Sequence, residues 1–157
     1  MVLPKTGLAA FSSMALFNNH YRTHDFGLLL LRVGIGIMFT IHGYPKLVGG
    51  PEKWLELGGV MKMLGLNFAP AVWGFLAAIA EAVGGQLIAL GLFFRIACGL
   101  LVVTMLVATL THLMSGDAFN AYSHALESLF LFLGLAFAGP GRYSLDQLLF
   151  PARRRLY

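Results

Sequence analysis

Four long apolar stretches follow one another along the chain, and each has about the length of a membrane-spanning helix. They cover residues 26–44, 71–93, 96–113 and 122–138. A bilayer core about 30 Å thick needs roughly 20 helical residues, so each stretch comes close to spanning it. The last is short, and we expect Tyr122 and Tyr143 to lie near its two interfaces. The pattern predicts an all-α membrane protein built as a four-helix transmembrane bundle.

Two other segments have the pattern of amphipathic helices. In GLAAFSSMALFNN, the side chains of Leu8, Phe11 and Ala15 recur at helical spacing, which indicates an interfacial N-terminal arm rather than a cleaved signal. The first connection, 49–70, is long for a bundle and is rich in apolar residues, so we expect an amphipathic helix resting on the outer face like a lid. The predicted organisation is an N-terminal arm, a four-helix domain and a basic tail, at 1–25, 26–149 and 150–157.

The basic residues predict the orientation. The N-terminal arm, the second connection and the residues after the fourth predicted helix, Arg142 included, together carry seven Lys and Arg, whereas residues 45–70 carry three and the third connection none. By the positive-inside rule, both termini of this multi-pass protein lie in the cytoplasm, with Arg153, Arg154 and Arg155 facing anionic headgroups. Only 11% of residues are charged and 58% are hydrophobic. We therefore expect the chain to lie in a lipid bilayer. Its basic residues form no broad stripe, so it is not expected to bind nucleic acid.

Several ionisable or amide side chains nevertheless fall within or at the ends of the predicted helices. An ionised group at bilayer depth costs at least about 2.5 to 3.5 kcal/mol, so such residues normally face the protein interior and have partners. Glu81 lies in the middle of the 71–93 helix, on a face rich in Ala and Gly that lets a neighbouring helix approach. Arg32 can reach that depth from the 26–44 helix. We therefore expect an Arg32–Glu81 ion pair, in either a structural or a chemical role.

The remaining polar residues collect in the outer half of the predicted bundle. His124 and Glu127 share one helical face, and Lys46 is expected to anchor the end of its helix in water while His42 stays below it. Together they predict a polar pocket that opens outward. The candidate catalytic residues are Glu81, His42 and Arg32, and the candidate pocket residues are His112, His124, Glu127, Lys46 and Gln86. For His42 a bond to a backbone carbonyl is the structural alternative, and for Gln86 it is a packing hydrogen bond.

The residue types limit the cofactors. The single Cys98 excludes dithiol chemistry and cysteine-based metal sites within one chain. Two of the histidines could in principle hold a haem, but nothing in the sequence requires it, and the carboxylates are too few for a dimetal site. No metal is expected. A quinone fits better, because it needs an apolar slot, hydrogen-bond donors and a route for protons.

Three motifs resemble those of the DoxX family of small four-helix bacterial membrane proteins. They are R-x9-HG-x2-KL from Arg32, E-x2-GG from Glu81, and G-x-G-x-YSLD ending at Asp146. The likeness runs from about Phe26 to Leu149. It implies that the signature positions are Arg32, His42, Gly43, Lys46, Glu81, Gly84, Gly85 and Asp146. It also implies a bacterial inner-membrane location and kinship with the membrane subunit of a thiosulfate:quinone oxidoreductase, although no cysteine is placed here to carry sulfur.

The sequence therefore favours a membrane subunit that supports quinone-linked oxidoreduction, working with a soluble or membrane-bound redox partner. One alternative is a non-enzymatic membrane anchor, for which Asp146 and the tail would be the sensitive surfaces. Another is a proton-coupled carrier of small solutes that uses Glu81. Four helices are few for a monomeric carrier, so that alternative requires a homo-oligomer.

Overall fold

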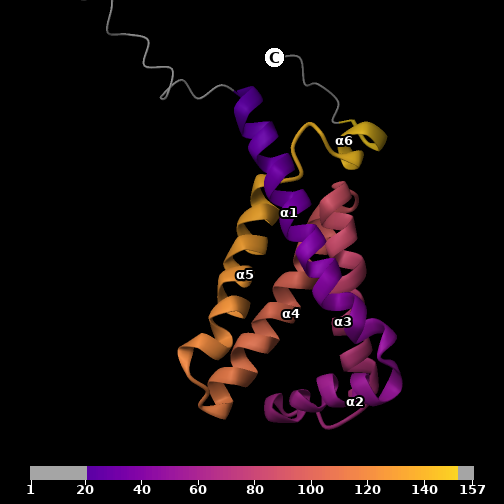
Figure 1. The fold of residues 1–157 in the computed structure, drawn as a ribbon, viewed down its shortest axis with the longest axis vertical. Coiled ribbons are helices and arrows are strands. Elements are labelled where there is room, and N and C mark those ends of the chain that lie inside the picture. The colour runs from indigo at the N-terminus through magenta and orange to yellow at the C-terminus, as the bar shows by residue number, and fades with distance from the viewer. Residues whose placement is uncertain (1–20, 152–157) are drawn as a thin grey trace, which may run out of the picture.

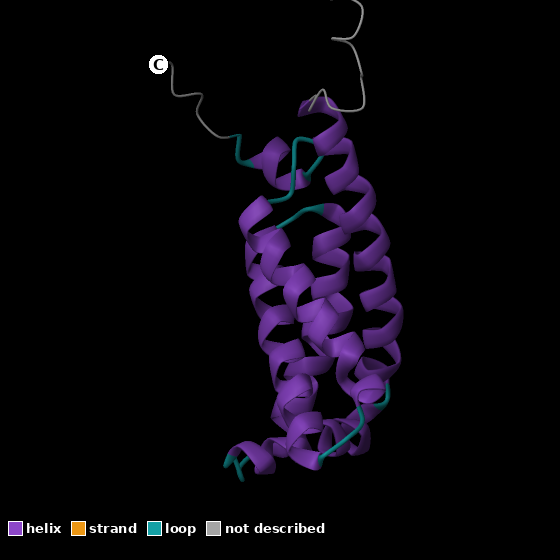
Figure 2. Cartoon of the chain, turned by 90° about the vertical axis from the view of Figure 1, so that its left-hand side faces the viewer, coloured by secondary structure: helices purple, strands orange, loops and turns teal. Residues whose placement is uncertain are grey.

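A computed structural model describes residues 21–151, and this part of the chain is helical with no strand (Figures 1 and 2). The helices are α1 (Tyr21–Val48), α2 (Gly50–Gly59), η1 (Val60–Leu64, a 3-10 helix), α3 (Pro70–Leu90), α4 (Phe94–Ser115), α5 (Phe119–Ala138) and α6 (Leu145–Leu149). The expected interfacial helix before residue 21 and the basic tail at Arg153 to Arg155 lie outside the described residues.

Four of these helices are long and apolar enough to cross a membrane: α1 from Thr23, α3, α4 and α5. This confirms the predicted four-helix transmembrane bundle. The boundaries differ most in α1, which begins before Phe26 and continues through Pro45 to Val48. Pro45 lacks an N–H, but its carbonyl still accepts a bond from the N–H of Gly49 at 3.0 Å, so the helix does not end there.

The first connection forms helices, as its amphipathic pattern predicts. Figure 1 shows α2 lying across the lower end of α3. Two glycines allow this crossing, because a Cβ on Gly58 would overlap the carbonyl of Pro70 and one on Gly74 would overlap that of Trp54. The Trp54 ring also packs against Phe75, with 4.7 Å between ring centroids. The crossing fixes α2 at the end of the bundle where α1 terminates.

Glycines also set the distance between α1 and α3, the two helices that pack most closely (Figure 1). A Cβ on Gly36 would lie 2.5 Å from the carbonyl oxygen of Gly85, and a Cβ on Gly43 would lie 2.7 Å from the Cβ of Glu81. Small residues at helix contacts in membranes let backbones approach, because van der Waals packing has to replace the missing hydrophobic drive. The α1–α3 contact therefore tolerates no side chain at these positions.

The apolar core joins this pair to α4 and α5. Phe39 on α1 meets Phe132 on α5 edge to face, with centroids 4.7 Å apart. Ile88 on α3 and Phe94 on α4 are fully buried beside them. Cys98 on α4 is also fully buried, as expected. In Figure 1 the α1–α3 and α4–α5 pairs are close near α6 and diverge toward α2.

Candidate functional site

The central polar contact of the bundle is an ion pair between Lys46 and Glu81. The Nζ of Lys46 lies 2.8 Å from Oε1 and 2.5 Å from Oε2 of Glu81. The Glu81 side chain is 6% exposed, whereas that of Lys46 is 33% exposed. Lys46 therefore links a buried carboxylate on α3 to the partly accessible end of α1.

The predicted Arg32–Glu81 pair is wrong. Arg32 instead donates through Nη1 to the carbonyl of Ala89 at 2.6 Å, and through Nη2 to the carbonyl of Tyr143. The antiparallel register of α1 and α3 explains the difference, since Gly36 faces Gly85 and Gly43 faces Glu81. This register carries Arg32 to the last turn of α3, where carbonyls lack helical partners and a cation is favourable.

Lys46 is likewise not the water-facing anchor that the sequence suggested. The continuation of α1 past Pro45 keeps Lys46 on the helical face that carries His42, four residues earlier. Its ammonium group is turned to Glu81 rather than away from the protein. The i, i+4 spacing of His42 and Lys46 was the feature of the sequence that indicated this position, because it places both side chains on one face of α1.

His42 and His124 come together from α1 and α5. Their ring centroids are 6.0 Å apart with a 50° tilt, and Phe39 stacks on His124 at 6.3 Å. Both histidines are exposed at the surface of the chain, whereas Phe39 is 3% exposed. The two imidazoles thus lie next to the buried ring of Phe39, and His42 lies one turn from Lys46.

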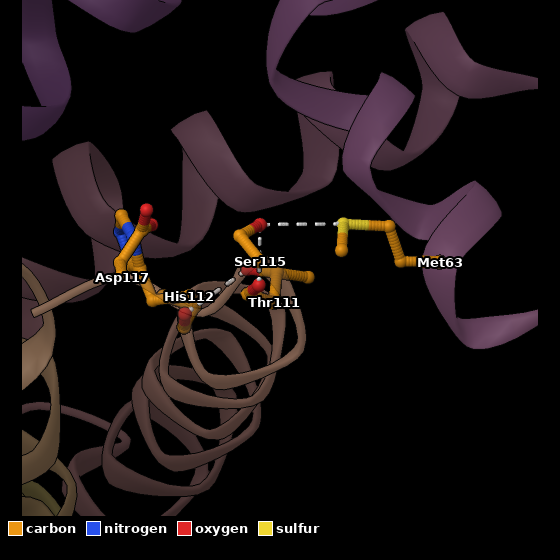
Figure 3. A network of polar contacts seen from close by, with 6 residues as sticks. Met63, Thr111, His112, Ser115 and Asp117 are labelled. Atoms are coloured by element: carbon orange, nitrogen blue, oxygen red, sulfur yellow. Dashed lines mark hydrogen bonds and ion pairs between the residues drawn. The ribbon is translucent and has the colours of Figure 1, made fainter.

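Within residues 21–151, the other predicted pocket residues make no hydrogen bond or ring contact with this cluster. His112 bonds Asp117 through Nδ1 at 2.7 Å, in the turn that ends α4 (Figure 3). Nearby, the hydroxyl of Ser115 donates to the carbonyl of Thr111 and contacts the sulfur of Met63 on η1. Glu127 is exposed on α5. Gln86 is exposed on α3, because five residues along a helix turn it far from the face of Glu81.

Asp146 has a structural role that the sequence did not reveal. Its two carboxylate oxygens accept the N–H groups of Phe93 and Phe94 at 2.8 and 2.9 Å, which caps the start of α4 from α6. Its own N–H donates to the carbonyl of Gly91 at 2.9 Å. The YSLD segment therefore holds the α3–α4 turn together with Arg32.

The described part of the chain offers few candidate ligands for a metal ion. Residues 21–151 contain no group of three or more His, Cys, Asp or Glu that could hold a metal ion. The polar groups that the fold does gather are an ammonium, a carboxylate and two imidazoles. These groups bind and move protons, and the ammonium and imidazole groups can donate to carbonyl oxygens of a small molecule.

The fold and this polar cluster define a small multi-pass membrane protein with ionisable side chains inside a four-helix bundle. The chain belongs to the DoxX family, whose model matches residues 27–114. It is 27% identical over 133 residues to "Putative oxidoreductase CatD" of Bacillus subtilis (strain 168), covering 85% of this chain and 94% of that protein. It is 32% identical over 146 residues to "Inner membrane protein YphA" of Escherichia coli (strain K12), covering 82% and 99%. No solved structure matches the chain.

Proposed function

We propose that this chain is a bacterial inner-membrane protein that supports quinone-linked oxidoreduction at the Lys46–Glu81 and His42–His124 cluster. The observation that carries the proposal is the ion pair itself, a buried carboxylate reached through a partly exposed ammonium group. His42 lies one turn from Lys46 on α1, and His124 on α5 lies beside His42. The names of the two relatives, "Putative oxidoreductase CatD" and "Inner membrane protein YphA", agree with this assignment.

The chemistry of a quinone matches these groups. Reduction of a quinone to a quinol takes up two electrons and two protons, and the protons must reach the two ring oxygens. In the proposed site, imidazoles of His42 and His124 donate to a carbonyl oxygen and pass protons on, since histidine changes protonation state near neutral pH. A redox partner protein has to supply the electrons.

Lys46 and Glu81 have a positioning and proton-holding role in this scheme. The ammonium group pairs with the buried Glu81 carboxylate, and a carboxylate next to a proton path can exchange a proton with a bound substrate. We place both termini in the cytoplasm, which puts the cluster in the outer half of the membrane.

Of the two surfaces expected for the anchor alternative, Asp146 is occupied inside the chain by Phe93, Phe94 and Gly91, and the basic tail lies outside the described residues. The carrier alternative has no observation of its own in its favour. We therefore keep quinone-linked oxidoreduction as the one proposed function.

The test is quinone binding and reduction in membranes that contain the full chain. Glu81→Gln and His42→Ala should each lower quinone reduction by at least about tenfold, the scale expected for removing a proton-transfer group. Glu56→Gln is the matched control, since Glu56 is an exposed carboxylate on α2 paired with Lys53. Gentle purification should also recover quinone in the lipid extract. Unchanged reduction in both variants, with no quinone bound, would contradict the proposal.

A further inference from the structure

A shallow groove of about 290 Å³ runs between α1 and α3 on the surface of the bundle. It is lined by Ile37, Thr40, Ile41, Gln86, Ala89 and Leu90. Ile37, Ile41 and Leu90 are about half exposed, which suits contact with lipid or with another apolar surface. Gln86 is the exception, because it places an amide among these apolar side chains.

The Gln86 amide has no hydrogen-bond partner within residues 21–151, and its neighbour Thr40 already donates its hydroxyl to the carbonyl of Gly36 at 2.8 Å. Its depth makes this costly. Gln86 lies within the apolar span of α3, about 6 Å of helix from its end at Leu90. Hydrocarbon at this level offers the amide no bond.

A second copy of the same chain satisfies this amide, because a glutamine side chain carries both donors and an acceptor. Two copies in one membrane share the same orientation, so a closed pair is related by a two-fold axis along the membrane normal. A residue near that axis lies against the same residue of the other copy. Each Gln86 then donates to the carbonyl oxygen of the other, while the flanking apolar side chains of both grooves pack together.

We propose that the α1–α3 groove around Gln86 is the contact between two copies of this chain, closed by reciprocal Gln86 amide bonds. A lipid acyl chain would fill the same volume but would leave the amide unpaired. The contact is separate from the Lys46–Glu81 site, so the proposed dimer does not depend on the proposed quinone chemistry.

Disulfide crosslinking in native membranes tests the contact. Gln86→Cys should give a covalent dimer on mild oxidation, because the two-fold axis brings this position against its own copy. Val103→Cys, 60% exposed on α4, is the matched control and should remain monomeric. The unsubstituted chain sets the background, since its single Cys98 is fully buried.

The amide itself is tested by measuring dimer dissociation of the otherwise unmodified chain in detergent. Gln86→Leu should raise the dissociation constant about three- to tenfold, and Gln86→Asn should have a smaller effect. The proposal is overturned if Gln86→Cys crosslinks no better than Val103→Cys, or if Gln86→Leu leaves the dissociation constant unchanged. The second result would mean that the Gln86 amide does not hold two copies together.

Discussion

Lys46 on α1 holds both carboxylate oxygens of Glu81 on α3, and this pair couples the end of one membrane helix to the middle of another. Glu81 is almost completely buried, so its charge depends on the ammonium group beside it. The contact is possible only because Gly43, one turn before Lys46, leaves room for the α3 backbone. The ion pair and the glycine contact therefore act together.

Breaking the pair should destabilise the bundle. Lys46→Met leaves a buried carboxylate without a counter-ion, and we expect it to lower the free energy of unfolding by about 3 kcal/mol. This is the low end of the range for buried pairs, because the Lys46 side chain is a third exposed. Thermal unfolding in detergent measures the loss.

The double variant Lys46→Met with Glu81→Leu is the informative companion. Replacing both charges by apolar groups removes the uncompensated carboxylate, so most of the stability should return while quinone reduction stays low. A double variant as unstable as Lys46→Met alone would contradict this account of the pair.

Arg32 and Glu81 should prove energetically independent. Arg32 bonds the carbonyls of Ala89 and Tyr143 and makes no bond to Glu81. In a double-mutant cycle, Arg32→Met and Glu81→Gln should therefore be additive within about 0.5 kcal/mol, whereas Lys46→Met and Glu81→Gln should couple strongly. A large coupling between Arg32 and Glu81 would show that the two side chains interact.

Gly43 should tolerate no larger residue. In Gly43→Ala the new Cβ would lie 2.7 Å from that of Glu81, which forces α1 and α3 apart and should cost about 1 to 3 kcal/mol of stability. Gly34→Ala is the control on the same helix, because nothing lies within 4 Å of a Cβ there. That change should be neutral or stabilising by up to about 1 kcal/mol. Equal losses for the two variants would refute the close contact.

Asp146 should matter for folding and not for chemistry. Asp146→Ala leaves the N–H groups of Phe93 and Phe94 without their acceptors and should lower stability by about 1 to 3 kcal/mol. Asp146→Asn keeps one acceptor oxygen and should lose less. Per folded molecule, quinone reduction should be unchanged. A loss of activity at full stability would instead return Asp146 to the list of functional residues.

The periodicity of apolar residues was enough to predict the four membrane helices and the helical first connection. It was not enough to predict which side chains bond to one another. Arg32 was matched to Glu81 by depth alone, whereas the actual register follows from where Gly36, Gly43 and Gly85 allow the backbones to touch. Local spacing shows which face a side chain occupies, but the register between helices depends on close packing that a single sequence does not display.

Other features were hidden for similar reasons. The cap from Asp146 joins residues more than fifty positions apart in the chain, and only the folded arrangement brings α6 over the α3–α4 turn. His42 and His124 were both expected to line the pocket, but their ring contact over Phe39 depends on how α5 crosses α1. The chemical roles of these residues remain predictions for the experiments above.

The bond from Arg32 to Tyr143 also orders events in time. Its two partners are 111 residues apart, so the ribosome releases the first helix long before the acceptor exists. Until then a guanidinium group near the start of the protein lacks one of the two carbonyls that bind it in the finished fold. A nascent chain that ends with α5 already carries all four membrane helices, so the Arg32–Tyr143 bond forms only after the last of them has been made.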